Sequence, residues 1–135
     1  MRTVFADTGY WIAVVDKRQD LHAKAMAVSE ALRPFRIVTS QMVLVELLNS
    51  KRIPRPAALS LVDEMREDSN TTVVEQTGEL FSEALDLYRR YKDKSWSLTD
   101  CSSFVIARKL GITEALAHDR DFKDFGLRCL LRSDG

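Results

Sequence analysis

The sequence predicts an α/β fold in which helices cover both faces of a mostly parallel, five-stranded sheet. Short apolar or β-branched segments alternate along the 135 residues with longer segments whose apolar residues recur at helical spacing. Parallel strands require crossover connections, and right-handed crossovers place helices on both faces, which gives three layers, α/β/α. Because the chain shows no internal repeat and no shift in composition, we expect a single domain over residues 1–135.

Five segments have the short apolar or β-branched pattern of buried strands. Turn-forming residues bound them, as at Asp7-Thr8-Gly9 after the first segment and Asn70 before the third. The predicted strands span residues 2–6, 36–39, 71–74, 115–117 and 127–131.

The intervening segments are predicted to be helical because their ends carry start and stop residues. Ser40 is a suitable N-cap, whereas Pro34 and Gly111 end the helices before them. The clearest amphipathic stripe consists of Leu80, Ala84, Leu87, Tyr88 and Tyr91. The predicted helices span residues 10–15, 21–32, 41–50, 57–67, 77–91 and 99–110, with a helical turn at 121–125 and a frayed tail at 132–135.

The charge balance limits the function classes. With 20 basic and 20 acidic side chains the net charge is zero, which argues against a general polyanion binder. A nuclease function is still compatible with this charge, because a metal held by some of the acids would leave the rest of the protein basic. No apolar run approaches the roughly 20 residues of a membrane span, and no signal peptide pattern opens the chain. We therefore expect a cytoplasmic protein with no membrane partner, in which Cys101 and Cys129 are free thiols.

Two acidic residues lie just beyond the ends of predicted strands. Asp7 comes after the first strand, and Asp119 follows the fourth strand by one residue. Since ligands of parallel sheets bind outside the carboxyl ends of the strands, both carboxylates are expected at that edge.

Two further acidic residues lie on helices that begin at the same edge. Glu46 stands about six residues, or roughly 9 Å, into the helix that follows the second strand, and it is flanked by apolar residues. Asp100 opens the helix that leads into the fourth strand, so it must begin at the edge where that strand ends. We therefore expect all four carboxylates to converge.

Converging carboxylates would repel one another, and burial would raise their pKa values, unless a cation neutralised them. Oxygen-only ligation favours Mg²⁺ or Mn²⁺, whereas His22 and His118 are too few for a typical zinc site. A metal held in this way lowers the pKa of a bound water and stabilises charge on a phosphodiester. The sequence thus predicts metal-assisted hydrolysis, with one or two metals.

Each of three aspartates also has a purely structural interpretation. Ser97 and Asp100 have the spacing of a capping box at a helix start. Asp7, which precedes a Thr-Gly pair, suits an Asx-turn, and Asp119 suits a turn before the last helical segment. The metal hypothesis depends on the joint pattern rather than on any one of these residues.

The remaining polar candidates are similarly divided. Glu46 could pair with Lys51 or Arg52 at the edge of its helix, and Asp121 could complement a helix dipole or serve as an auxiliary ligand. Lys51, Arg52 and Arg55 form a basic cluster that could touch substrate phosphates or simply remain solvated.

Four segments of the chain also resemble those of a known family. They are Val4-Phe5-Ala6-Asp7-Thr8, Val43-Leu44-Val45-Glu46-Leu47, Ser97-Leu98-Thr99-Asp100-Cys101 and His118-Asp119-Arg120-Asp121-Phe122. In this order they resemble the PIN domain, particularly the VapC-type toxins of bacterial toxin–antitoxin pairs, over roughly residues 3–131. One departure is His118, where the family often has a small or hydroxyl residue; this bears on metal access and pH dependence.

The resemblance implies a PIN-like fold with strand order 3-2-1-4-5 and Mg²⁺- or Mn²⁺-dependent cleavage of RNA. Asp7, Glu46, Asp100 and Asp119 would be the acidic set, with Asp7, Asp100 and Asp119 on the metal and Glu46 on the metal or the attacking water. Thr8 would match the hydroxyl that often follows the first aspartate, and with Lys51, Arg52 and Arg55 it is a weaker candidate for substrate binding. The family also implies a homodimer and a cognate antitoxin that blocks the acidic pocket.

We therefore predict a metal-dependent endoribonuclease that is the toxin of a type II toxin–antitoxin pair. Two other hypotheses stay open at this point. One is a PIN-like module that binds RNA or protein without cleaving. The other is a phospho-acceptor receiver domain, although Val74-Glu75 stands where the third strand would need an acceptor aspartate. Which RNA would be cleaved cannot be derived from the sequence.

Overall fold

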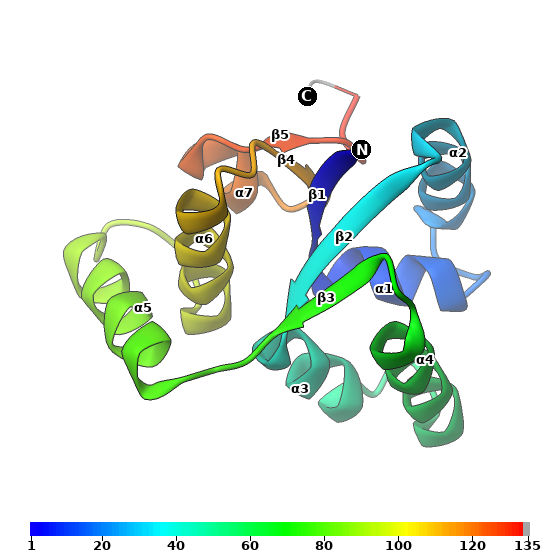
Figure 1. The fold of residues 1–135 in the computed structure, drawn as a ribbon, viewed down its shortest axis with the longest axis horizontal. Coiled ribbons are helices and arrows are strands. Elements are labelled where there is room, and N and C mark those ends of the chain that lie inside the picture. The colour runs from blue at the N-terminus through cyan, green and yellow to red at the C-terminus, as the bar shows by residue number, and fades with distance from the viewer. Residues whose placement is uncertain (134–135) are drawn as a thin grey trace.

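The computed structural model describes residues 1–133, and its centre is a sheet of five parallel strands (Figure 1). Their order is β3-β2-β1-β4-β5, which confirms the predicted strand order and the α/β class. The strands are β1 (Arg2–Ala6), β2 (Phe35–Ser40), β3 (Thr71–Val74), β4 (Glu114–Leu116) and β5 (Arg128–Cys129). β1 is central, and Val4, Phe5 and Ala6 are completely buried, as its apolar sequence predicts.

β5 is shorter than the predicted strand at 127–131. At its start the chain is still closing the preceding helix, because Leu127 donates its backbone N–H to the Phe122 carbonyl at 3.1 Å. Beyond Cys129 two backbone hydrogen bonds continue toward β4, from Leu130 to Ala115 and from Leu131 to Ala117. The predicted tail at 132–135 lies partly outside the described residues.

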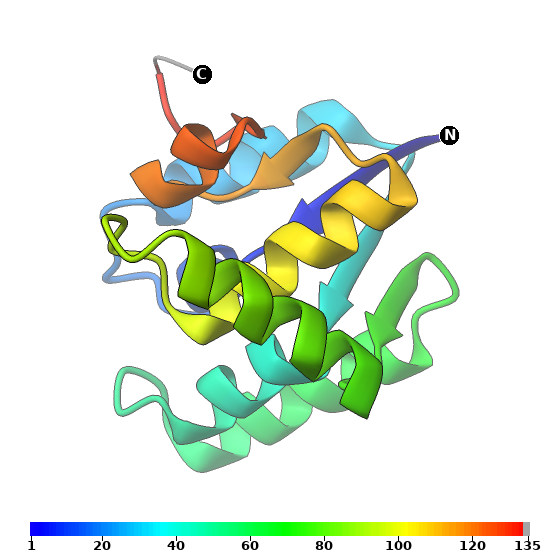
Figure 2. The same cartoon turned by 90° about the vertical axis from the view of Figure 1, so that its left-hand side faces the viewer.

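Seven helices connect and cover the strands within residues 1–133. Most begin or end within one or two residues of the predicted positions. They are α1 (Thr8–Val15), α2 (His22–Leu32), α3 (Gln41–Asn49), α4 (Arg55–Glu67), α5 (Gly78–Arg90), α6 (Leu98–Leu110) and α7 (Arg120–Phe125). Helices α1 to α4 lie on one side of the sheet and α5 to α7 on the other, with α5 packed outside α6 (Figures 1 and 2). No helix in this described part of the chain is long and apolar enough to cross a membrane.

A chain of aromatic rings joins α6 and α7 to the central strand. Phe104 of α6 lies 4.9 Å from Phe122 of α7 between ring centroids, and Phe122 lies 6.3 Å from Phe5 of β1. Phe104 also stacks on Phe125 at 4.4 Å and meets Trp96 edge-on at 5.0 Å. Aromatic pairs at these separations favour defined orientations. The rings therefore fix where α6 and α7 begin relative to β1.

The helix starts at the carboxyl edge of the sheet are set by local sequence. Ser40 ends β2 and caps α3, because its side chain accepts a hydrogen bond from the Val43 N–H at 3.2 Å. Thr39, fully buried beside it, donates its hydroxyl to the Ala6 carbonyl at 2.9 Å. At the opposite end of α6, Gly111 adopts a left-handed φ of 66°, as its predicted role as the stop residue requires.

Candidate active site

The first part of the site lies where β1 ends. Asp7 occupies the N-cap position of α1 but makes no capping hydrogen bond with its side chain, so its partly buried carboxylate is available to the site. The next residue, Thr8, donates its hydroxyl to Oε1 of Glu46 on α3 at 2.5 Å. The hydroxyl thus links α1 to α3 and orients the Glu46 carboxylate. Glu46 is half-buried in the predicted position, and its described partner is Thr8 rather than Lys51 or Arg52.

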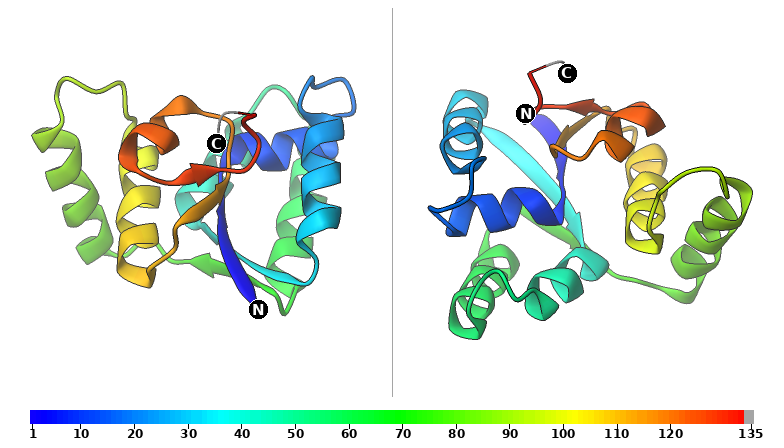
Figure 3. Two further views of the ribbon diagram at one scale, coloured as in Figure 1. Left: turned by 90° about the horizontal axis from the view of Figure 1, so that it is seen from above. Right: turned by 180° about the vertical axis from the view of Figure 1, so that it is seen from behind.

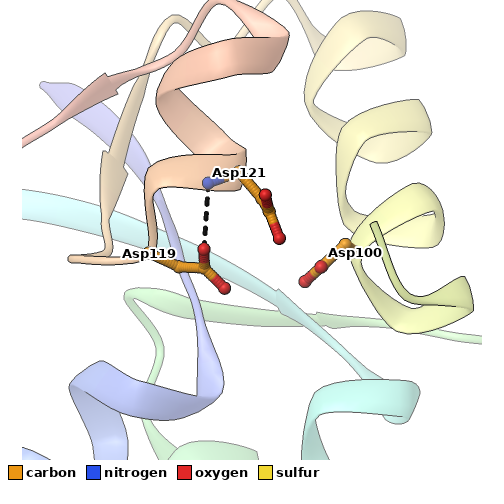
Figure 4. A group of neighbouring side chains, drawn as sticks. All are labelled: Asp100, Asp119 and Asp121. Carbon is orange, nitrogen blue, oxygen red and sulfur yellow. Dashed lines mark hydrogen bonds between the residues drawn. The ribbon is translucent and has the colours of Figure 1, made fainter. Parts of the chain in front are cut away.

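The second part of the site is a cluster of three aspartates from the starts of α6 and α7. One carboxylate oxygen each of Asp100, Asp119 and Asp121 lies within 4.8 Å of the others. Figure 4 shows Asp100 and Asp121 directed into the space between the two helix starts, with Asp119 beside them. Two of these residues belong to the predicted acidic set, and the third, Asp121, was predicted only as a helix-dipole residue or auxiliary ligand.

Asp100 combines the two interpretations that its sequence context allows. The Ser97 hydroxyl accepts from the Asp100 N–H at 3.0 Å, and Asp100 Oδ2 accepts from the Ser97 N–H at 3.1 Å, which completes the capping box. One carboxylate oxygen is therefore held by the backbone, and this fixes the direction of the other. The capping box predicted from the spacing of Ser97 and Asp100 is confirmed, and capping is what aims the carboxylate.

Asp119 and Asp121 are held in a similar way at the start of α7. Asp119 is the N-cap, and its Oδ1 accepts from the Asp121 N–H at 2.9 Å. Asp121 Oδ1 accepts a hydrogen bond from the Ser95 hydroxyl at 3.0 Å, across 26 residues of sequence. The Asp-x-Asp spacing was the available signal for Asp121, but only the tertiary contact with Ser95 brings that carboxylate into the cluster.

Burial and mutual repulsion raise the pKa of two of these carboxyl groups. The pKa of Asp7 rises to about 7, first because of burial and then because of the charges of Asp100, Glu46 and Asp119, although a hydrogen bond from the Thr8 backbone opposes this. Burial likewise raises the pKa of Asp100 to about 6, with further contributions from Asp119 and Asp121. Charges from both parts of the site therefore raise the pKa of Asp7, and the two parts are coupled electrostatically.

The donor set fits a hard divalent cation. The cluster offers carboxylate oxygens only, at separations that one ion could span, and added positive charge would relieve the repulsion that raises the two pKa values. Neither histidine competes for this role: His22 pairs its Nδ1 with the Ala13 carbonyl, and His118 is exposed. Oxygen-only ligation favours Mg²⁺ or Mn²⁺ over zinc.

The weaker substrate candidates are placed differently. Thr8 donates its hydroxyl to Glu46 and is partly exposed. Lys51, Arg52 and Arg55 are exposed between the end of α3 and the start of α4. Lys51 and Arg52 follow the end of α3 and Arg55 opens α4, so the three cations begin five residues beyond Glu46.

Comparison with known proteins identifies the class of protein. The model of the PIN domain matches residues 4–127, which is most of the chain. The chain therefore belongs to the PIN domain family, and the receiver-domain hypothesis is discarded. The chain is also 31% identical, over 91% of its length and 94% of theirs, to two curated proteins of Mycobacterium tuberculosis, from strains CDC 1551 / Oshkosh and H37Rv; each is named 23S rRNA-specific endonuclease VapC20.

Two solved structures share the fold. The crystal structure of Mycobacterium tuberculosis VapC20, described as a sarcin–ricin loop cleaving toxin, matches with a TM-score of 0.83 and 30% identity, covering 92% of this chain and 95% of that one. The structure of VapBC2 from Rickettsia felis, bound to a DNA fragment from its promoter, matches with a TM-score of 0.62 and 15% identity, covering 94% and 96%. At that identity the second match speaks for the fold alone.

Proposed function

We propose that the protein is a metal-dependent endoribonuclease and the toxin of a type II toxin–antitoxin pair. Residues 1–135 would act as one nuclease domain. The observation that carries the proposal is the cluster of Asp100, Asp119 and Asp121, whose carboxylate oxygens lie within 4.8 Å of one another and which is coupled electrostatically to Asp7. The overall similarity to VapC20, which is named an rRNA endonuclease, supports the same activity.

In this proposal Asp7, Asp100 and Asp119 hold Mg²⁺ or Mn²⁺, with Asp121 as a further ligand. The bound ion would lower the pKa of a water and stabilise negative charge on the phosphodiester. Glu46 binds the ion or orients the attacking water, and the Thr8 hydroxyl keeps its Oε1 in place, which leaves the second oxygen for that task. The raised pKa values leave Asp7 partly protonated near neutral pH and Asp100 partly protonated at slightly acidic pH. These protons must leave before the carboxylates can bind a cation.

The proposed substrate class is structured RNA. VapC20 is described as cleaving the sarcin–ricin loop, so this stem-loop of 23S rRNA is the first substrate to test. The partners that we propose for the chain are a cognate antitoxin and a second copy of itself in a homodimer, in the cytoplasm. Lys51, Arg52 and Arg55 would contact phosphates of the bound RNA.

The proposal is tested by incubating a labelled sarcin–ricin stem-loop with the purified protein. We expect cleavage with Mg²⁺ or Mn²⁺, none with EDTA, and none by Asp100→Asn with either ion. Asp124→Asn is the matched control, because Asp124 lies exposed on α7 and pairs with Arg120 outside the cluster. Full activity of Asp100→Asn, or cleavage in EDTA, would refute the metal mechanism. No cleavage of any RNA by the native chain would favour a silent PIN-like binding module.

A further inference from the structure

A loop at residues 91–97 leads from the end of α5 into α6 (Figure 3). Residues of this loop and of the end of α5 line a cavity of about 460 Å³. Three aromatic residues and three cations line it, namely Tyr88, Tyr91, Trp96, Arg89, Lys92 and Lys94, and the one further lining residue is a leucine. Among the described residues that form the cavity wall there is no carboxylate. The net charge of the chain is zero, so this cavity wall is locally basic. A basic wall favours binding of an anion.

The aromatic residues form a floor and two exposed faces. Trp96 is 6% exposed and is held by Phe104 and Phe125, so it cannot move freely. Tyr91 packs on Trp96 at 5.0 Å between ring centroids, yet it remains 37% exposed, and Tyr88 is 50% exposed. Both tyrosines belong to the apolar stripe predicted for α5, but the structure leaves them open to solvent beside the cations.

The same loop connects this cavity to the acidic site. Lys94 and Trp96 line the cavity, whereas the residues that alternate with them, Ser95 and Ser97, bond to the acidic residues. Ser95 donates to Asp121 Oδ1 at 3.0 Å, and Ser97 donates its backbone N–H to Asp100 Oδ2 at 3.1 Å. This loop therefore contributes residues both to the cavity wall and to the hydrogen bonds that hold the acidic cluster.

We propose that this cavity is a substrate subsite that holds one single-stranded nucleotide of the RNA next to the cleaved bond. The assignment rests on the proposed ribonuclease function. The base stacks on Tyr88 and Tyr91, and the phosphate lies against Arg89, Lys92 and Lys94. Sequence-tolerant binding of single strands combines these two elements, aromatic faces and a cationic groove. Arg89 already pairs with exposed Asp86 at 3.5 Å, a contact that a phosphate would replace with a bidentate one.

The test measures RNA binding in EDTA, so that binding is separated from cleavage. The probe is a fluorescein-labelled oligouridylate of about 12 nucleotides, and the readout is fluorescence anisotropy. We expect Tyr88→Ala and Tyr91→Ala each to raise the Kd about tenfold, whereas Tyr88→Phe and Tyr91→Phe keep the ring and the affinity. Because Tyr88 is half exposed, Tyr88→Ala should destabilise the fold less than Tyr91→Ala. Thermal unfolding of each variant checks that the fold is retained.

The charges are tested by the salt dependence of the same binding. Replacing Arg89, Lys92 or Lys94 with Gln should each lower the slope of log K against log salt by up to about 0.7. Arg90→Gln is the matched control, because Arg90 is the exposed neighbour of Arg89 on α5 and does not line the cavity. Equal slopes for Arg89→Gln and Arg90→Gln, both unchanged, would overturn the phosphate assignment.

Unchanged affinity in both Tyr→Ala variants, or absence of binding by the native protein, would overturn the subsite and leave the cavity to a protein partner. These outcomes differ from failure of the proposed function, which is measured separately by cleavage with Asp100→Asn. If the native protein, Tyr88→Ala and Tyr91→Ala all cleaved RNA equally well, the ribonuclease function would stand and the subsite would be lost. A protein that binds RNA through the tyrosines but never cleaves it would retain a nucleotide-binding cavity and lose the ribonuclease function, and with it the assignment of the cavity to a cleavage site.

Discussion

The two halves of the acidic site are held together by different means. In the β1–α3 half, formed by Asp7 and Glu46, the Glu46 carboxylate is held by the Thr8 side chain, which belongs to another helix. In the α6–α7 half, formed by Asp100, Asp119 and Asp121, backbone N–H groups at two helix starts hold Asp100 and Asp119. One half therefore depends on tertiary packing, and the other depends largely on local capping.

This difference indicates that the two halves have different roles in the site. The α6–α7 half presents three convergent carboxylates, which is what a cation needs. The β1–α3 half contains Asp7, which has the more strongly raised pKa, and a glutamate whose one oxygen is fixed. We expect substitutions in the α6–α7 half to act first on the metal, and those in the β1–α3 half to act on proton balance and on the orientation of Glu46.

The largest effect is expected from Asp119→Asn. Asn keeps the shape and can still cap α7 through its side-chain oxygen, but it removes a charge that the metal would neutralise. A loss of roughly 4 kcal/mol of transition-state stabilisation corresponds to about a 10³-fold fall in kcat. The measurement is cleavage of the sarcin–ricin stem-loop under single-turnover conditions. If Asp119→Asn cleaved at a rate similar to that of Asp124→Asn, the α6–α7 half would not hold the metal.

The second effect concerns the stability of the metal-free protein. The unfolded chain loses the Asp7 proton near its ordinary pKa of 3.8, whereas the folded protein keeps it until about pH 7. Stability therefore falls as the pH rises through this window and stays low above it. At pH 8 in EDTA, we expect Asp7→Asn to raise the free energy of unfolding by roughly 2 to 4 kcal/mol, and at pH 4 to leave it nearly unchanged.

Urea unfolding at the two pH values measures this difference, and adding Mg²⁺ at pH 8 should stabilise the native chain more than Asp7→Asn. Asp63→Asn is the control, because Asp63 is exposed on α4. Its free energy of unfolding should differ from that of the native chain by the same small amount at both pH values. A destabilised Asp7→Asn protein at pH 8 would contradict the account of Asp7 as a repelled carboxylate.

The third effect tests the hydrogen bond between Thr8 and Glu46. Groups that orient a metal ligand typically contribute 10- to 100-fold to activity. We expect Thr8→Val, which keeps the shape but removes the hydroxyl, to lower kcat by about that much, while Thr8→Ser restores most of it. The comparison of kcat with KM is informative, because a phosphate-binding role for Thr8 would raise KM instead.

The smallest effect is expected from Ser95→Ala, which removes the hydrogen bond that holds Asp121 in the cluster. Asp121 keeps its place on α7, so we expect a fall in kcat of less than about tenfold, within the lower range for orienting groups. Asp121→Asn should lower kcat more than Ser95→Ala does. Equal, full activity of both variants would remove Asp121 from the set of ligands.

Local sequence signals explain what could be predicted of this fold and site. Ser40, Ser97 and Gly111 mark helix ends through contacts within a few residues, so the element boundaries followed from their neighbours. The strand order followed from the resemblance to the PIN domain. Asp7 and Asp119 could be placed at one sheet edge because each lies shortly after the end of one of two parallel strands.

Long-range contacts explain what could not be predicted. Asp121 joins the cluster through Ser95, and Thr8 meets Glu46 across 38 residues, so no local pattern reveals either bond. Tyr88 and Tyr91 remain exposed although they continue the apolar stripe of α5. Periodicity places these two rings on the apolar face of α5 but cannot show that this part of the face remains open.

The central claim is that the carboxylates hold a divalent cation, and calorimetric titration of the metal-free protein with Mn²⁺ tests it most directly. The account predicts that the native chain and Asp63→Asn bind Mn²⁺ with release of protons at pH 6.5, since Asp7 and Asp100 are still partly protonated there. Asp100→Asn and Asp119→Asn should bind at least about tenfold more weakly. Absence of Mn²⁺ binding by the native chain, or unchanged affinity in both variants, would contradict it.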